Sequence, residues 1–242
     1  MKSEKLAVIG SSKKSTMSGS QTFFDAAEKI GAVKVKLCGF TDAGEAEQAI
    51  ELGADALGFN FWPKSKRYLD PAIGREWLPD LAGKITRVGV FVNASESEIL
   101  SLLEGGLIDA AQLHGDETPE FVASLIERGH RAFKALGVKD RSQLENAAAF
   151  PGDMLLLDAW APVERGGTGE AMDWALGAEA VQRWPDRHII LAGGLKPENV
   201  ADAIRQVRPF AVDVASGIEA GTPGRKDPTL MATFLEAARE IG

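Results

Sequence analysis

The sequence has a single cysteine, no long hydrophobic run and no excess of positive charge. Because Cys38 is alone among 242 residues, no disulfide can form within the chain, which favours a reducing compartment. No apolar stretch approaches the roughly 20 residues of a membrane-spanning helix, and the apolar run 6–9 is too short for a signal-peptide core. These features favour a soluble, cytoplasmic protein with no membrane partner.

The charge balance and the histidines argue against two further kinds of partner. The chain has 27 basic and 35 acidic residues, a net charge of −8, which disfavours a basic nucleic-acid-binding surface. His114, His130 and His188 lack the spacing of metal ligands, so we expect no metal. With 45% apolar and 26% charged residues, the composition is that of an ordinary globular domain.

The first 32 residues differ from the rest of the chain. The small polar residues at 10–16 are typical of a mobile segment, and the apolar spacing within 23–30 favours a short amphipathic helix. We therefore divide the chain into an N-terminal extension, 1–32, and a catalytic domain, 33–242. The domain is expected to be complete without the extension.

From Val33 onward, short apolar runs alternate with segments of helical periodicity. The strand-like runs lie at 33–40, 56–61, 85–92, 110–115, 131–136, 154–159, 188–194 and 211–217. The helical segments lie at 43–52, 71–81, 96–104, 118–128, 141–150, 171–183, 197–207 and 228–241. Asp42, Ser95, Pro119 and Pro197 supply helix-start signals.

Eight strands that alternate with eight helices require parallel strands joined by right-handed crossovers. The pattern predicts a single α/β domain, a (β/α)8 TIM barrel. A doubly wound dinucleotide-binding sheet is disfavoured, because no GxGxxG motif follows the first strand.

Two reactive side chains fall where a barrel places its active site, at the carboxyl ends of the strands. Alternation along the first run puts Lys36 and Cys38 on the inward face, and Asp158 is inward near the end of the sixth. A thiol and a carboxyl group at one barrel mouth can act as a base and an acid. The alternatives are a buried structural thiol for Cys38 and a helix cap for Asp158. Lys36 either favours the thiolate or forms an internal salt bridge.

Glycine-rich strand ends indicate an anion site. Gly193 and Gly194 end the seventh run, and Ser216 and Gly217 end the eighth. Backbone N–H groups can approach a ligand closely there, and a short helix after the eighth strand would add donors. The alternative is a pair of tight turns.

Three further side chains are weaker candidates. Arg67, in a basic loop after the second run, can bind a carboxylate with its planar fork or belong to a solvated surface. Gln112 and His114 share one face at the end of the fourth run, although a single histidine is often structural. The glycine-rich segment 166–169 has no resemblance to a Walker motif.

Together these motifs resemble those of the phosphoribosylanthranilate isomerase family of tryptophan biosynthesis. The matching pieces are KLCGFT at 36–41, GFNF at 58–61, SKRY at 65–68, GVFV at 89–92, QLHG at 112–115, LLD at 156–158, GGTG at 166–169, AGGL at 192–195, DVASGIE at 213–219 and PG at 223–224. They occur in the family's order from Val33 to the C-terminus.

The resemblance implies an Amadori rearrangement of N-(5-phospho-β-D-ribosyl)anthranilate to 1-(2-carboxyphenylamino)-1-deoxyribulose 5-phosphate, without a cofactor. It implies that Asp158 is the general acid and Cys38 the general base, so their environments must keep the carboxyl protonated and the thiol ionised. Arg67 is expected to bind the anthranilate carboxylate, with Gln112 and His114 as further substrate contacts. The phosphate would lie on Gly193, Gly194, Ser216 and Gly217, in a monomer or a homodimer.

Two rival functions share this scaffold. The related isomerase of histidine biosynthesis, or a bifunctional form, resembles a two-aspartate design, and Cys38 at the end of the first strand argues against it. A non-catalytic phosphoribosyl-ligand-binding barrel remains the alternative of another class, since a fold does not imply an activity. The chain departs from the family's pattern in its extension and in the segment 219–223, which is one residue longer than usual.

Overall fold

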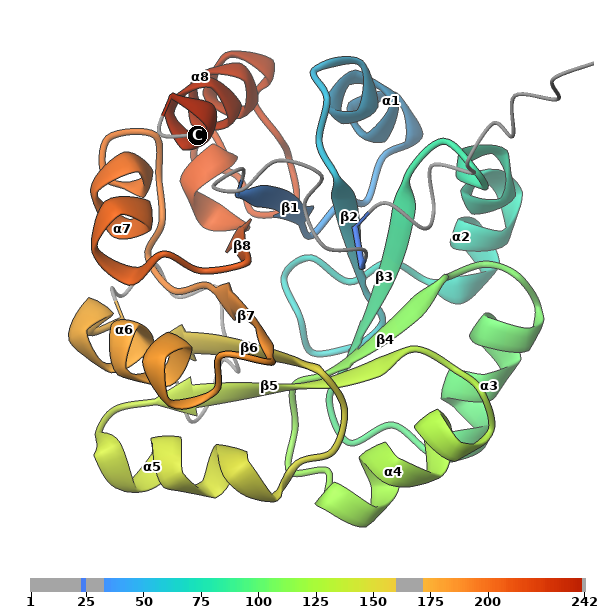
Figure 1. The fold of residues 1–242 in the computed structure, drawn as a ribbon. Coiled ribbons are helices and arrows are strands. Elements are labelled where there is room, and N and C mark those ends of the chain that lie inside the picture. The colour runs from blue at the N-terminus through green and yellow to red at the C-terminus, as the bar shows by residue number, and fades with distance from the viewer. Residues whose placement is uncertain (1–22, 25–32, 160–171, 241–242) are drawn as a thin grey trace, which may run out of the picture.

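The computed structural model describes residues 23–24, 33–159 and 172–240. In these residues eight parallel strands close into a barrel in sequence order, with helices around it (Figure 1). The strands are β1 (Lys34–Cys38), β2 (Ala56–Asn60), β3 (Thr86–Phe91), β4 (Ala110–Leu113), β5 (Ala132–Val138), β6 (Met154–Ala159), β7 (His188–Leu191) and β8 (Ala211–Val214). The predicted TIM barrel is confirmed.

The helices follow the strands in strict alternation. They are α1 (Ala43–Glu51), α2 (Pro71–Trp77), α3 (Glu96–Glu104), α4 (Pro119–Glu127), α5 (Arg141–Asn146), α6 (Trp174–Arg183), α7 (Val200–Val207) and α8 (Pro228–Arg239), with short 3-10 turns η2 (Leu78–Leu81), η3 (Ala147–Ala149) and η4 (Ser216–Ile218). Across the described ranges, no helix combines the length and the apolar character needed to cross a membrane.

Most of the element boundaries agree with the sequence patterns, and the exceptions have local causes. Asp42 and Ser95 cap α1 and α3 as predicted. Pro197, however, does not begin a helix. The Asn199 side chain accepts a hydrogen bond from the Lys196 N–H (2.9 Å) and donates one to the Gly194 carbonyl (3.0 Å). These bonds hold a turn, so α7 begins only at Val200.

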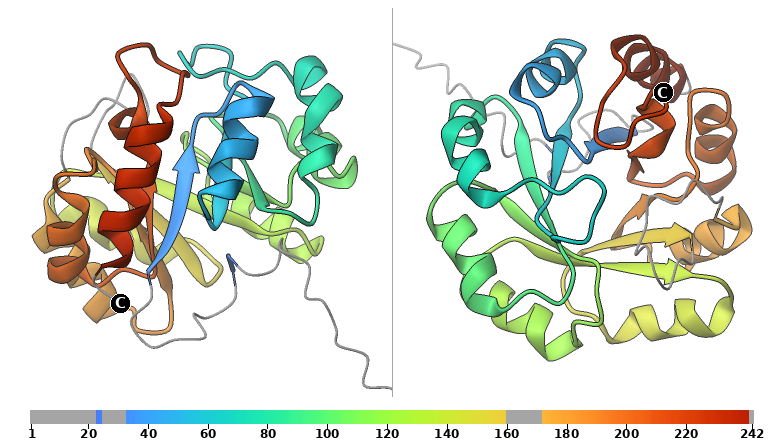
Figure 2. Two further views of the ribbon diagram at one scale, coloured as in Figure 1. Left: turned by 90° about the horizontal axis from the view of Figure 1, so that it is seen from above. Right: turned by 180° about the vertical axis from the view of Figure 1, so that it is seen from behind.

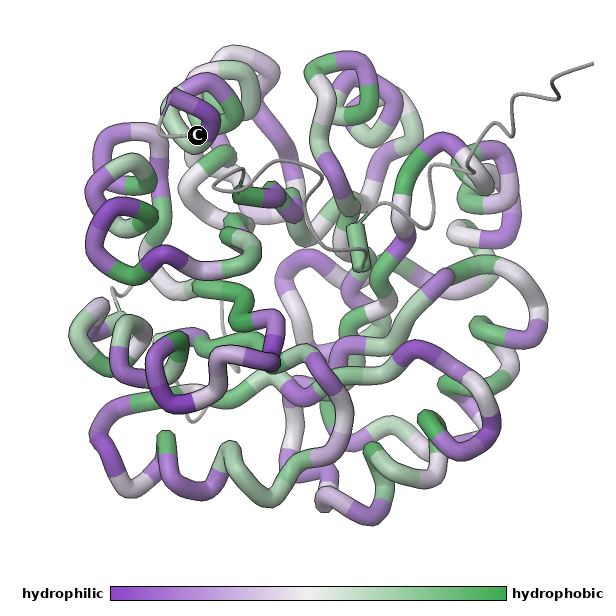
Figure 3. Tube along the Cα trace, viewed as in Figure 1, coloured by the Kyte–Doolittle hydropathy of each residue, from purple (hydrophilic) through white to green (hydrophobic). Residues whose placement is uncertain are grey.

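The barrel has two apolar layers, and strand alternation separates them. Leu155 and Leu157 of β6 pack outward against the helices, whereas Met154 and Leu156 point into the barrel, as predicted. Figure 3 shows hydrophobic residues gathered along the strands and polar residues on the outer turns of the helices. The inward parity of Asp158 follows from the same alternation.

A phenylalanine of the N-terminal extension lies inside the barrel. Phe23 has no exposed surface and packs with Ala56, Ala110 and Ala211, which are the first residues of β2, β4 and β8. Phe24 contacts the Phe23 ring edge-on, with centroids 5.3 Å apart. Both lie in a turn near the end of the barrel where the strands begin (Figure 2). Three small alanines leave room that the ring fills.

This packing joins the extension to the barrel core, while the expectation that the barrel is complete without the extension stays a prediction. Residues 25–30 of the expected short helix lie outside the described residues, and a domain boundary at residue 33 stays a prediction. Phe23 belongs to the core of the barrel although it precedes that boundary.

We expect Phe23→Ala to lower the free energy of unfolding by about 3–5 kcal/mol, because a fully buried ring is replaced by a cavity. Chemical denaturation followed by circular dichroism measures the change. Ile73→Ala on α2, where the side chain is 52% exposed, is the matched control and should change stability little. Equal stability of the two variants would show that the ring does not support the core.

Candidate active site

Cys38 ends β1, and the thiol is buried at the carboxyl end of the barrel. Its register partner on β2 is Gly58. A Cβ atom at Gly58 would lie 2.5 Å from the Cys38 Sγ, so only a glycine leaves space for the sulfur. The sequence thus reserves room for this thiol on the neighbouring strand.

Lys36 precedes Cys38 by two residues on β1, so both lie on the inward face. Its side chain pairs with Asp213 of β8. Its Nζ is 2.6 Å from the Asp213 Oδ1, and Lys36 has no exposed surface. The two residues are also register partners where β8 meets β1. The internal salt bridge, one of the two predictions for Lys36, is therefore confirmed.

The ionisation of Cys38 differs from the expectation. Burial raises the pKa of the thiol above its ordinary value, and the nearby Lys36 cation opposes this rise without cancelling it. This direction opposes the ionisation that a base requires, and the role of Cys38 as the base stays a prediction. The Lys36 ammonium still keeps the pKa of the thiol lower than burial alone would make it.

Asp158 is the inward residue near the end of β6 and is 6% exposed. Burial, reinforced by the negative charge of Asp213, raises the pKa of this carboxyl from 3.8 to about 7. A Cβ atom at Gly193 would lie 3.0 Å from the Asp158 Oδ1, so the glycine that follows β7 makes room for the carboxyl. A proton donor is thus available near neutral pH, as the acid role requires.

Gln112 and His114 reach the acid. The Gln112 Nε2 lies 3.3 Å from the His114 Nδ1, and the His114 Nε2 lies 3.6 Å from the Asp158 Oδ2. The Gln112 Oε1 is buried and has no hydrogen-bond partner among the described residues. The structure therefore places His114 beside Asp158 and Gln112 beside His114.

The two glycine-rich strand ends meet, as the anion-site prediction requires. Gly193 and Gly194 both have positive φ angles, of 87° and 65°. Gly217 lies so close to the Leu195 carbonyl that a Cβ atom there would overlap it. Ser216 begins η4, the short helix expected after β8. The loops after β7 and β8 are thus in contact, and the anion site itself stays a prediction.

The planar fork of Arg67 does bind a carboxylate, and in this structure the carboxylate is that of Glu219. The Arg67 Nε and Nη2 lie 2.8 and 2.7 Å from the Glu219 Oε1 and Oε2. The reading of Arg67 as part of a solvated surface is wrong, since its side chain is 11% exposed.

Sequence reasoning missed three charged residues of the site: Asp213, Glu219 and Lys226. Alternation along β8 could have predicted that Asp213 points into the barrel, because its neighbours Val212 and Val214 point outward. Nothing local marks Glu219 and Lys226, which meet Arg67 only through the closure of the barrel.

Two other predictions concern the glycine-rich segment and metal binding. The glycine-rich segment 166–169 lies outside them. Within 33–159 and 172–240, no group of three or more His, Cys, Asp or Glu side chains could hold a metal ion.

The fold is that of a (β/α)8-barrel enzyme, and Cys38 and Asp158 lie at the carboxyl ends of β1 and β6, where such barrels carry their active sites. The sequence model for N-(5'-phosphoribosyl)anthranilate (PRA) isomerase matches residues 35–237. The chain belongs to the N-(5'-phosphoribosyl)anthranilate isomerase family, which confirms the resemblance carried by the motifs.

Individual relatives agree with this assignment. The N-(5'-phosphoribosyl)anthranilate isomerase of Thermotoga maritima is 43% identical over 209 residues, which span 86% of this chain and 100% of that protein. A crystal structure of the Thermotoga maritima protein, 42% identical, superposes with a TM-score of 0.77 over 86% of this chain and 99% of its own. Another crystal structure contains the isomerase in complex with reduced 1-(o-carboxyphenylamino)-1-deoxyribulose 5-phosphate; it is 40% identical, with a TM-score of 0.75 over 86% and 99% of the two chains.

The raised pKa of Asp158 predicts how stability depends on pH. In the folded state the carboxyl binds its proton up to about pH 7, whereas the unfolded chain releases it near 3.8. The wild type therefore loses stability as the pH rises through this window, by at most on the order of 4 kcal/mol. The amide of Asp158→Asn does not titrate, so the free energy of unfolding of this variant should not fall for this reason as the pH rises.

Urea denaturation between about pH 5 and about pH 8 measures the difference. Asp202→Asn on α7, where the carboxylate is 70% exposed, should follow the wild type. A stability gap between the wild type and Asp158→Asn that stays constant over this pH range would contradict the raised pKa.

Proposed function

We propose that this chain catalyses the Amadori rearrangement of N-(5-phospho-β-D-ribosyl)anthranilate to 1-(2-carboxyphenylamino)-1-deoxyribulose 5-phosphate, a step of tryptophan biosynthesis. The observation that carries the proposal is the placement of the chain's single thiol and of a buried carboxyl, whose pKa is raised to about 7, at the carboxyl ends of β1 and β6. The named relatives and the product analogue bound by one of them support the substrate class.

Asp158 is the acid of the first step. Its proton passes to the oxygen of the ribose ring, the C1'–O bond breaks, and the anthranilate nitrogen forms an iminium with C1'. A carboxyl that still holds its proton near neutral pH suits this role, because proton transfer is most efficient when the pKa lies close to the working pH.

Cys38 is the base of the second step. Its thiolate takes the proton from C2', and the electrons of that C–H bond form the C1'=C2' double bond of an enolamine. The enolamine then becomes the ketone as C1' gains a proton and the C2' hydroxyl loses one. Transfer of the proton from the Cys38 thiol to the Asp158 carboxylate through substrate or water returns both side chains to their starting states. Hydrogen moves only within one molecule and water, so the reaction needs no cofactor.

The proposed mechanism needs Cys38 ionised and Asp158 protonated when the substrate binds. Burial raises the pKa of both side chains, which favours the protonated acid and opposes the ionised base. Lys36 lowers the pKa of Cys38 more than Asp213 raises it, and Asp213 raises the pKa of Asp158 more than Lys36 lowers it. On balance the ion pair therefore favours the productive form at both sites.

The remaining candidates bind the substrate in this proposal. Arg67 receives the anthranilate carboxylate, Gln112 and His114 contact the substrate beside the acid, and the backbone of the loops after β7 and β8 holds the phosphate. Gly193, Gly194, Ser216 and Gly217 are the residues of those loops. We further propose a cytoplasmic enzyme that is a monomer or a homodimer.

Loss of the substrate's anthranilate fluorescence on addition of the purified protein tests the activity. Asp158→Asn should lower kcat at least about a hundredfold, since the amide keeps the shape of the carboxyl but has no proton to give. Cys38→Ser should also lose most turnover, because a hydroxyl is a far weaker base, while it still binds a product analogue.

Two results would contradict the proposal. If the wild type did not consume the substrate, the proposed activity would be refuted. That result would favour the alternative of a non-catalytic ligand-binding barrel. Near-normal kcat in Asp158→Asn, with turnover in the wild type, would remove Asp158 from the role of acid.

A further inference from the structure

We infer that Glu219 is a positioning residue for substrate recognition: it holds the Arg67 guanidinium at the barrel mouth so that the free edge of the guanidinium receives the substrate's aromatic carboxylate. The inference rests on the proposed function and deepens it, because Glu219 would decide how strongly the enzyme prefers a carboxylated aromatic amine.

The pair is bidentate and buried. Glu219 accepts hydrogen bonds from the Arg67 Nε at 2.8 Å and Nη2 at 2.7 Å, and the two side chains are 5% and 11% exposed. A guanidinium has two edges that match a carboxylate. Glu219 occupies the Nε edge, so the edge formed by Nη1 and the second hydrogen of Nη2 is left for a second carboxylate.

The stem of Arg67 is fixed beside the base. Gly39 follows Cys38, and a Cβ atom at Gly39 would overlap the Arg67 Cδ. The arginine therefore lies across the glycine that leaves β1. With its stem on Gly39 and one edge held by Glu219, the guanidinium has little rotational freedom left to lose when a ligand binds.

Lys226 keeps the cluster cationic. A lone Arg–Glu pair is neutral and attracts an anion weakly. The Glu219 Oε1 also accepts a hydrogen bond from the Lys226 Nζ at 2.8 Å, and Lys226 donates a second one to the Ala215 carbonyl at 3.1 Å. Burial lowers the pKa of Lys226, and the bond to Glu219 opposes this fall. With Lys226 protonated, two cations on one carboxylate leave a net positive charge, so Glu219 orients Arg67 without cancelling its attraction for a carboxylate.

Glu219 itself is held in its charged form. Burial disfavours the carboxylate, but the bonds from Arg67 and Lys226 and the Gly224 N–H at 2.9 Å outweigh it and keep the pKa of Glu219 below its ordinary value. Glu219 lies in the loop after β8 and Arg67 in the loop after β2. The contact between Arg67 and Glu219 therefore depends on the closed barrel, whereas the bonds from Gly224 and Lys226 to Glu219 are local.

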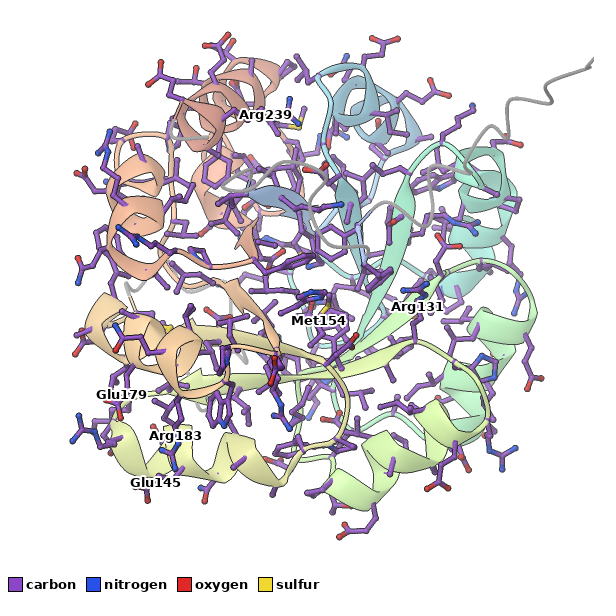
Figure 4. All side chains as sticks on the ribbon, viewed as in Figure 1. Arg131, Glu145, Met154, Glu179, Arg183 and Arg239 are labelled. Carbon is purple, nitrogen blue, oxygen red and sulfur yellow. The ribbon has the colours of Figure 1, made fainter. Side chains whose placement is uncertain are left out.

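The test compares two stable product analogues, one with the carboxylate on its phenyl ring and one without it. Isothermal titration calorimetry gives their Kd values for the wild type, Glu219→Gln, Arg67→Ala and the double variant. Glu179→Gln is the matched control, since Glu179 lies on the outer helix α6 (Figure 4). Its Oε2 accepts hydrogen bonds from the Nε and Nη2 of Arg141.

In Glu219→Gln we expect the preference for the carboxylated analogue to fall at least about tenfold, the size of one charge-assisted hydrogen bond. The Kd of the other analogue should change less than about threefold, and KM should rise with kcat nearly unchanged. Glu179→Gln should match the wild type. In the Arg67→Ala background Glu219→Gln should have no further effect on the preference, because Glu219 acts through Arg67.

Equal weakening of both analogues in Glu219→Gln would show a merely structural role and overturn the inference. An unchanged preference would overturn it as well. If Glu219→Gln does not fold, Glu219→Asp, which is too short to span both guanidinium nitrogens, must show the same selective loss. A wild type with no preference between the analogues, or with no turnover, would instead refute the proposed function.

Discussion

The buried ion pair between Lys36 and Asp213 is the interaction on which the site depends. Its two charges are 2.6 Å apart and out of water, where only mutual pairing offsets the cost of desolvation. Because the two residues are register partners of β1 and β8, the pair lies at the seam that closes the barrel. Its cation favours the Cys38 thiolate and its anion favours the protonated form of Asp158. One structural pair thus adjusts the base and the acid in the directions that the reaction requires.

Small residues at both ends of the barrel determine what the barrel can hold. At the carboxyl end, Gly58 leaves space for the Cys38 sulfur and Gly193 leaves space for the Asp158 carboxyl. At the opposite end, alanines at the starts of the strands leave a space that the Phe23 ring fills. Glycines thus accommodate the side chains at the carboxyl end, and an aromatic ring from the extension joins the core at the other end.

Alternation and period were enough to predict the barrel, the inward positions of Cys38 and Asp158, and the facing glycines after β7 and β8. Residues brought together by closure could not be predicted in this way. The Glu219 partner of Arg67 lies 152 positions away in the chain, and the Asp213 partner of Lys36 lies 177 positions away. The raised pKa of Cys38 was missed for a related reason, since it depends on burial in three dimensions. Phe23 was missed because its contacts are with strand starts that no local pattern links to it.

The effect of Lys36 on the ionisation of Cys38 is the most direct test of this account. The rate at which iodoacetamide adds one carbamidomethyl group to the single cysteine, followed by mass spectrometry across pH, reports the pKa of the thiol. The account predicts a wild-type pKa above the ordinary thiol value and a higher pKa still in Lys36→Met, which lacks the stabilising cation. An unchanged or lower pKa in Lys36→Met would contradict the claim that the ion pair sets the ionisation of the base.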